Sequence, residues 1–216
     1  DLKKLNFKSL NELFNYFETD KGSAVKNPYS KNKDNSDKSL IGHGYAEFYE
    51  FHFSYLKNKE IKLLEIGTWK GGSIASFYHY FSKAIIFCLD RNYKFQFKSS
   101  RINFFYCNTR NINELKKFEN LLINKKSENL DIIIDDGNHW TDHQIKAMEL
   151  YLPLLKKGGL YVIEDIQHGW PLEGHIKDPY GMLKSALPEE YTYVFHDLRD
   201  VSGRFDDSMM AIRHVE

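Results

Sequence analysis

The chain has 216 residues, of which 42% are hydrophobic, so it can bury the core of one domain and is not a disordered protein. Its 30 basic and 30 acidic side chains give a formal net charge of zero, which argues against nucleic acid as the main partner. No apolar run is long enough to span a bilayer and no signal peptide opens the chain, so we expect a cytoplasmic protein without a membrane partner. Cys88 and Cys107 show no metal-type spacing, and we expect both to be reduced and buried in strands.

Residues 1–58 are predicted to form helices that carry many aromatic side chains. Apolar residues at helical spacing predict one helix over 5–18, and an aromatic-rich pattern predicts another over 44–56. The polar stretch 24–39 between them is typical of a mobile surface loop, and a lid and a plain disordered insertion are equally compatible with it. The aromatic helices also offer a surface on which copies of the chain could associate as a homo-oligomer.

From residue 59 to residue 216, strands and helices alternate without a domain break, so we expect a single domain over residues 1–216. Seven apolar runs predict strands, at residues 61–67, 84–90, 102–107, 130–135, 159–163, 191–196 and 209–213. Helical patterns and one glycine turn fall between them, at residues 74–81, 112–124, 141–155 and Lys157-Gly158-Gly159. This alternation predicts an α/β fold with a doubly wound, mostly parallel sheet and helices on both faces.

The loop over residues 65–72, with the pattern Glu-x-Gly-x-x-x-Gly-Gly, lies between the first strand and a helix. Glycine lets backbone amides approach a ligand closely, and a helix start favours a negative group. The loop is not the dinucleotide fingerprint, because Trp69 stands where that pattern has its second glycine. Asp90 ends the second strand about 20 residues after Gly67, where an acid accepts hydrogen bonds from ribose hydroxyls. These residues predict a nucleoside-containing cofactor, and by themselves they leave NAD and S-adenosylmethionine open.

Two predicted strands run directly into carboxylates. The strand at 130–135 is followed by Asp136, Gly, Asn and His139, and the strand at 159–163 leads into the pair Glu-Asp at 164–165. In open α/β sheets, ligands bind outside the carboxyl ends of such strands. We therefore expect the chemistry of the protein at this edge of the sheet.

Several motifs coincide in this chain, namely Glu65-x-Gly67, Gly71-Gly72-Ser73, Asp90, the Ile-Ile-Asp-Asp-Gly-x-His segment 133–139 and Tyr161-Val-Ile-Glu-Asp165. Together they resemble the macrocin O-methyltransferase family, class I S-adenosylmethionine-dependent enzymes that methylate sugar hydroxyls. Thr19-Asp-Lys-Gly22 and Gly42-His-Gly-Tyr45 resemble the N-terminal signature of that family. The chain departs from the family at Asn138, where serine is usual, and in an insertion at 24–41. It is also shorter than the macrolide enzymes, so their acceptor cannot be carried over.

The resemblance implies a Rossmann-like class I methyltransferase fold, with seven strands in the order 3-2-1-4-5-7-6 and additional N-terminal helices. It implies S-adenosylmethionine and Mg²⁺ as cofactors. The implied cofactor-binding residues are Lys21, Tyr45, Glu65, Gly67, Gly71, Ser73, Asp90 and Asp135. The implied metal ligands are Asp136, Glu164 and Asp165, and the implied catalytic base is His139.

The chemistry of these side chains agrees with the resemblance. Three carboxylates at adjacent strand ends form a hard-oxygen site of the kind Mg²⁺ accepts, and without a cation their repulsion would raise their pKa values. A metal lowers the pKa of a hydroxyl that it binds, and a nearby imidazole can then take the proton at neutral pH. The alternative is structural: Asp136 and Asp165 would cap helices, and His139 would hydrogen-bond to backbone.

The sequence therefore predicts a Mg²⁺-dependent O-methyltransferase acting on a sugar hydroxyl, with a nucleotide-linked sugar for surface polysaccharide as the expected small-molecule substrate. Three alternatives stay open. The same fold could methylate another acceptor, such as a phosphoramidate or a natural product. The protein could be an NAD-dependent oxidoreductase, or a non-catalytic S-adenosylmethionine-binding subunit.

Overall fold

The computed structural model describes residues 9–24, 42–92, 99–124, 129–168, 178–202 and 205–215. Apart from Ala24, the expected loop at 24–39 lies outside these ranges, so its role as a lid stays a prediction. Among the described residues, no helix is long and apolar enough to cross a membrane.

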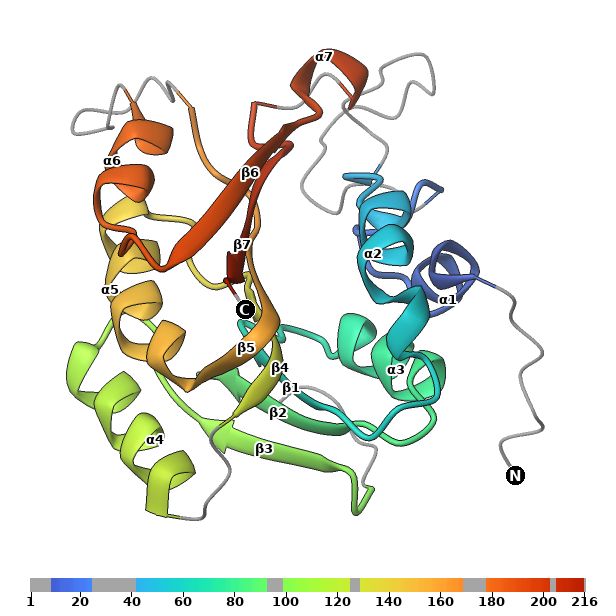
Figure 1. The fold of residues 1–216 in the computed structure, drawn as a ribbon. Helices are drawn as coiled ribbons and strands as arrows, with labels where there is room; N and C mark the ends of the chain where they lie inside the picture. The colour runs from blue at the N-terminus through green and yellow to red at the C-terminus, as the bar shows by residue number, and fades with distance from the viewer. Residues whose placement is uncertain are drawn as a thin grey trace.

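Seven strands form one sheet in the order β3-β2-β1-β4-β5-β7-β6 (Figure 1). The strands are β1 (Lys62–Ile66), β2 (Ile85–Asp90), β3 (Ile102–Tyr106), β4 (Leu130–Asp135), β5 (Leu155–Ile163), β6 (Tyr191–Asp197) and β7 (Ser208–His214). The first five pair in parallel, whereas β7 is antiparallel to both β5 and β6. The predicted strand order and the mostly parallel sheet are confirmed.

Helices cover both faces of this sheet (Figure 1). They are α1 (Leu10–Tyr16), α2 (Ala46–Phe53), α3 (Gly72–Tyr80), α4 (Ile112–Asn124), α5 (Thr141–Tyr151), α6 (Pro179–Ser185) and α7 (Arg199–Ser202). Neighbouring strand residues point to opposite faces, so Leu63 packs with α1, α2 and α3, whereas Leu64 packs with α4 and α5. Because both faces are buried, the strands are continuous apolar runs rather than alternating ones. Cys88 and Cys107 are buried and free, as predicted, but Cys107 lies directly after β3 rather than within a strand.

The three N-terminal helices are tied together at Glu50 and Phe14. Glu50 accepts hydrogen bonds from the backbone N–H of Leu10 and from the hydroxyl of Tyr80, each at 2.8 Å. Phe14 of α1 is fully buried, and its ring meets that of Phe77 in α3 edge to face at 5.6 Å. This packing fixes the end of α1 close to the sheet.

The segment after α1 folds back onto the helix that precedes it. Asn11 Oδ1 accepts from the N–H of Ser23, and Asn15 Oδ1 accepts from the N–H of Ala24, each at 3.0 Å. The N–H of His43 then donates to the carbonyl of Asp20 at 2.6 Å. Both family-like segments, 19–22 and 42–45, are thereby held side by side.

Two predicted boundaries were wrong, both around β5. The expected helix over 141–155 ends at Tyr151 and continues as a 3₁₀ turn over Leu152–Leu154, where Pro153 cannot donate a helical hydrogen bond. The expected turn at 157–159 lies inside β5, where the register with β4 shifts. Gly158 has a φ of +72°, so glycine there accommodates an irregularity within the strand rather than a turn before it.

The glycine loop after β1 passes very close to the end of β4. The N–H of Gly67 donates to the carbonyl of Leu89, and the N–H of Asp136 donates to the carbonyl of Ile66, at 2.8 and 2.9 Å. Gly67 has a φ of +85°, and a Cβ there would lie 2.0 Å from the carbonyl oxygen of Asp136. Only glycine allows β1, β2 and β4 to end this close together.

We predict that Gly67→Ala destabilises the protein much more than Gly44→Ala. Gly44 also has a positive φ, +72°, but a Cβ there would meet nothing within 4 Å, so alanine costs only the backbone strain of about 1–2 kcal/mol. Alanine at Gly67 adds a backbone clash and should cost at least about 2 kcal/mol more. Urea unfolding of both variants measures the difference, and equal costs would show that the close approach is unimportant.

Candidate active site

The carboxyl ends of β1, β4 and β5 bring the predicted metal ligands to one place. Asp135 pairs with Ile66 on one side and with Ile163 on the other, and the N–H of Glu164 donates to the carbonyl of Asp135 at 2.9 Å. Asp136 and the 164–165 pair therefore follow directly from adjacent strands. This juxtaposition is what the two acid-tipped strands predicted.

Asp136, His139 and Asp165 form a compact group of possible ligand atoms. Nε2 of His139 lies 3.2 Å from Oδ1 of Asp136 and 3.8 Å from Oδ2 of Asp165, and the ligand atoms of all three lie within 4.8 Å of one another. Two carboxylates and an imidazole suit a divalent cation chemically. His139 and Asp165 also have positive φ values of 61° and 50°, a strained conformation that clusters at functional sites.

The electrostatics of this group reflect its excess of negative charge. Burial lowers the pKa of His139, but the hydrogen bond to Asp136 and the carboxylate of Asp165 outweigh it and raise the pKa to about 9. Burial raises the pKa of Asp165, and His43 and His139 offset this only in part. The group therefore favours any added positive charge.

Glu164 is the most enclosed of the three predicted metal ligands. It is 1% exposed, and each of its carboxylate oxygens accepts a hydrogen bond within the chain, Oε2 from Nζ of Lys21 and Oε1 from the hydroxyl of Tyr49. The same Nζ donates to Oδ2 of Asp136 at 2.6 Å. Lys21, which the resemblance placed at the cofactor, instead contacts two predicted metal ligands and is 2% exposed.

Asp165 is held by the segment 42–45. The hydroxyl of Tyr45 donates to Oδ1 of Asp165 at 2.7 Å, and Nε2 of His43 lies 3.5 Å from Oδ2. Nδ1 of His43 donates to buried Asp207, so the ring is fixed from its other side. Tyr45, like Lys21, thus lies among the predicted metal ligands rather than along the cavity.

Sequence reasoning missed three residues of this site: His43, Tyr49 and Asp207. His43 lies in the Gly-His-Gly-Tyr segment that resembles the N-terminal signature of the family, so the sequence held a signal for it although no role was assigned. Tyr49 belonged to an aromatic pattern that predicted core packing, and Asp207 belonged to a polar turn. Nothing in the local spacing distinguishes these two from structural residues.

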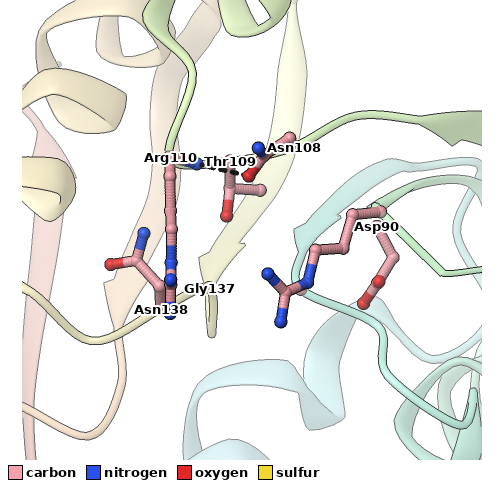
Figure 2. Close-up of a pocket in the computed structure, with 8 residues that line it drawn as sticks. Asp90, Asn108, Thr109, Arg110, Gly137 and Asn138 are labelled. Atoms are coloured by element: carbon pink, nitrogen blue, oxygen red, sulfur yellow. Dashed lines mark hydrogen bonds between the residues drawn. The ribbon is translucent and has the colours of Figure 1, made fainter.

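A cavity of about 530 Å³ opens beside these side chains, within the range of small-molecule sites. Its lining includes all four metal and base candidates and two of the predicted cofactor residues, namely Asp136, His139, Glu164, Asp165, Gly67 and Asp90. A smaller hollow of about 140 Å³ shares Gly67 and Asp90 with it. Figure 2 shows Asp90 on one side of this hollow and Arg110 and Asn138 on the other.

Asp90 is fixed by the backbone of its neighbours. Its Oδ2 accepts from the N–H of Trp69 in the glycine loop, and its Oδ1 accepts from the N–H of Asn92, each at 2.7 Å. Each carboxylate oxygen keeps further acceptor capacity. The arrangement leaves Asp90 able to accept from a ligand hydroxyl, as predicted from its place at the end of β2.

The other predicted cofactor residues are not part of the lining of this cavity. Gly71 caps α3 with a φ of +80°, and Ser73 donates to Oε2 of Glu65 at 2.8 Å. Oε1 of Glu65 and Oδ2 of Asp135 are buried without a hydrogen-bond partner among the described residues. Burial raises the pKa of Glu65 to about 8 and that of Asp135 to about 7. Buried acceptors of this kind call for donors from outside the chain, such as a ligand or water.

Comparison with known proteins defines the class of this fold and then its relatives. Residues 64–166 match the family model described as a methyltransferase domain. The structure of MycE methyltransferase from the mycinamycin biosynthetic pathway, in complex with Mg, SAH and mycinamycin VI, superposes with a TM-score of 0.70. It is 22% identical and covers 98% of this chain and 56% of that chain. The sheet is that of a class I methyltransferase.

Among curated proteins, demethylmacrocin O-methyltransferase of Streptomyces fradiae is 31% identical over 188 residues, 80% of this chain and 45% of its own length. Mycinamicin VI 2''-O-methyltransferase of Micromonospora griseorubida is 30% identical over 160 residues, 67% of this chain and 39% of its own length. The chain is a relative of these O-methyltransferases, and the resemblance inferred from its motifs is confirmed. It spans less than half the length of the curated relatives that it matches.

We predict that Glu65→Gln makes the ligand-free protein relatively more stable as the pH rises from 5 to 8. The folded pKa of about 8 exceeds the ordinary 4.5, so the native state binds this proton more tightly than the unfolded state does. Wild-type stability is therefore lost as pH rises through this window, on the order of 3 kcal/mol, whereas glutamine does not titrate and still accepts from Ser73. Denaturant unfolding at both pH values measures this, with exposed Glu47→Gln as the control. A pH-independent difference between Glu65→Gln and wild type contradicts it.

Proposed function

We propose that this chain is an S-adenosylmethionine- and Mg²⁺-dependent O-methyltransferase whose acceptor is a hydroxyl of a sugar. The observation that carries the proposal is the convergence of Asp136, His139 and Asp165 on the cavity that Gly67 and Asp90 also line. The relatives are named as O-methyltransferases, two of them for rhamnosyl and olivosyl compounds, which supports the same chemistry here. We further propose that residues 1–216 act as one methyltransferase domain.

The cofactor end of the cavity suits S-adenosylmethionine, which supplies a reactive methyl group when bound. Gly67 lines this end of the cavity, and Asp90 would accept from the ribose hydroxyls. Glu65 and Asp135 would provide buried acceptors, with Gly71 and Ser73 shaping the loop beside them. The unpartnered carboxylate oxygens are the feature of this chain that fits a polar cofactor.

The acceptor end suits a divalent cation held by Asp136, Glu164 and Asp165. Bound Mg²⁺ would compensate the charge that raises the pKa of His139 and would lower the pKa of the acceptor hydroxyl. His139 would take the hydroxyl proton at Nε2. Asp136 would hold the imidazole in place, since its Oδ1 lies 3.2 Å from that nitrogen.

The acceptor itself is proposed more finely as a nucleotide-linked sugar for surface polysaccharide. Two relatives are named for rhamnosyl tetracenomycin-C and L-olivosyl-oleandolide, so a glycosylated natural product is the competing acceptor. A non-catalytic S-adenosylmethionine-binding subunit is the alternative without turnover. The methyltransferase-domain match favours a methyltransferase, or a non-catalytic subunit with the same fold, over an NAD-dependent oxidoreductase.

We predict that the purified chain binds S-adenosylmethionine in a calorimetric titration, and that Asp90→Asn weakens this affinity about tenfold or more. The amide offers one acceptor oxygen where the carboxylate offers two charged ones, and a hydrogen bond to a charged group contributes about 1.5–3 kcal/mol. Asp142→Asn, on the exposed start of α5, is the matched control and should bind like wild type. Absence of binding heat in the wild type would refute the cofactor assignment.

We predict that His139→Ala and Asp136→Asn each reduce methyl transfer by about 100-fold or more, while S-adenosylmethionine affinity stays within about threefold. The acceptors are a panel of sugar nucleotides and glycosylated natural products, and mass spectrometry detects the added methyl group. Chelation of divalent metal should abolish turnover in the wild type. His214→Ala, at the far end of β7, is the control. Full turnover by both site variants would exclude the proposed base and metal ligand.

A further inference from the structure

Lys21 is the cation that lies deepest in the carboxylate cluster. Its Nζ donates to Asp136 at 2.6 Å and also to Glu164, and its side chain is 2% exposed. Tyr49 of α2 donates to the other oxygen of Glu164. Two of the three residues that would hold a metal, Asp136 and Glu164, are thus bridged by a positive charge that belongs to the chain.

The position of Lys21 is set by a rigid turn. Gly22 packs so closely that a Cβ there would lie 2.4 Å from Oδ1 of Asn15, and a Cβ on Gly42 would lie 2.3 Å from the carbonyl oxygen of Gly22. The hydrogen bond from His43 to the carbonyl of Asp20 closes the same turn. Lys21 therefore enters the cluster from a fixed backbone and not as a flexible surface side chain.

A buried ammonium between two carboxylates has two electrostatic consequences. It compensates negative charge that would otherwise repel within a low-dielectric interior, which stabilises the folded chain without metal. It also reduces the attraction of the same carboxylates for a second cation, because like charges a few ångströms apart repel strongly in partly buried sites. Glu164 has both oxygens engaged, so an ion that binds it must displace or share a hydrogen bond from Lys21 or Tyr49.

We propose that Lys21 is a built-in counter-cation of this site, which holds the carboxylates together without metal and competes with Mg²⁺ for Asp136 and Glu164. The inference rests on the proposed function, because it assigns the divalent ion to these carboxylates. It makes Lys21 a positioning residue that sets metal affinity. The segment 19–22 thereby links the N-terminal helices to the metal site.

The test is titration of the metal-free protein with MgCl₂ alone in a calorimeter, without S-adenosylmethionine. Lys21→Met should bind Mg²⁺ about tenfold more tightly than wild type, whereas Lys21→Arg, which keeps the cation, should stay within about threefold of it. Lys146→Met is the matched control, because Lys146 pairs with Asp142 at 3.5 Å on the exposed face of α5. Lys21→Gln keeps a hydrogen-bond donor without the charge and replaces Lys21→Met if that variant does not fold.

A second readout is the unfolding temperature in EDTA. Lys21→Met should unfold at a lower temperature than wild type, because it leaves the carboxylates without their counter-charge. Adding Glu164→Gln should recover part of the loss, because it replaces one uncompensated carboxylate by a neutral amide. A packing role of the lysine stem alone predicts no such rescue.

The outcomes separate the two proposals. If the wild type shows no Mg²⁺ heat but Lys21→Met does, the counter-cation role is supported and the wild-type metal site is weaker than proposed. If neither neutral variant binds Mg²⁺ more tightly than wild type, the counter-cation proposal is overturned, whatever the wild type binds. Loss of methyl transfer with retained Mg²⁺ binding would affect only the proposed function.

Discussion

The structure depends on how negative charge is compensated at the carboxyl edge of the sheet. Parallel β1, β4 and β5 end together, so the acids that follow them converge in a partly buried region. Uncompensated carboxylates there would repel one another and raise their pKa values. The segments 19–22 and 42–45 supply the ammonium, imidazole and hydroxyl groups that face these acids. The N-terminal helices therefore complete the site in addition to covering one face of the sheet.

Backbone geometry follows from the same convergence. His139 and Asp165 both adopt positive φ values, a conformation that costs about 1 kcal/mol or more for a residue with a Cβ. The strain is offset by fully buried strands on either side, in which Ile133, Ile134 and Ile163 have no exposed surface. A rigid core thus holds two side chains in orientations that a flexible loop would relax. Such preorganisation is what the proposed proton transfer to His139 would require.

The sequence was sufficient for the sheet and for the acid-tipped strands, because continuous apolar runs mark doubly covered strands and their ends are marked by charge. The sequence was insufficient to predict side-chain contacts between residues that lie far apart in the chain. His43 and Asp207 lie 164 residues apart, and Lys21 and Glu164 lie 143 apart, so no periodicity connects them. The resemblance named Lys21 and Tyr45 as functional but assigned them to the cofactor, whereas both contact the predicted metal ligands. The glycines at 158 and 159 misled because glycine permits a strand irregularity as readily as a turn.

The cavity is lined partly by residues at strand ends and partly by loop residues, and these two parts have different consequences for the choice of acceptor. Asp136, His139 and Asp165 follow strand ends, so the sheet sets their geometry, and in the proposed reaction this geometry would be the same for any acceptor hydroxyl. Apart from Asp90 at the end of β2, the remaining lining comes from segments outside the strands, including Trp69 and Arg91. Loops of this kind vary without disturbing the core, so they are where acceptor choice is expected to be made. Because the chain spans less than half the length of its curated relatives, their acceptors do not define the shape of the acceptor that this chain takes.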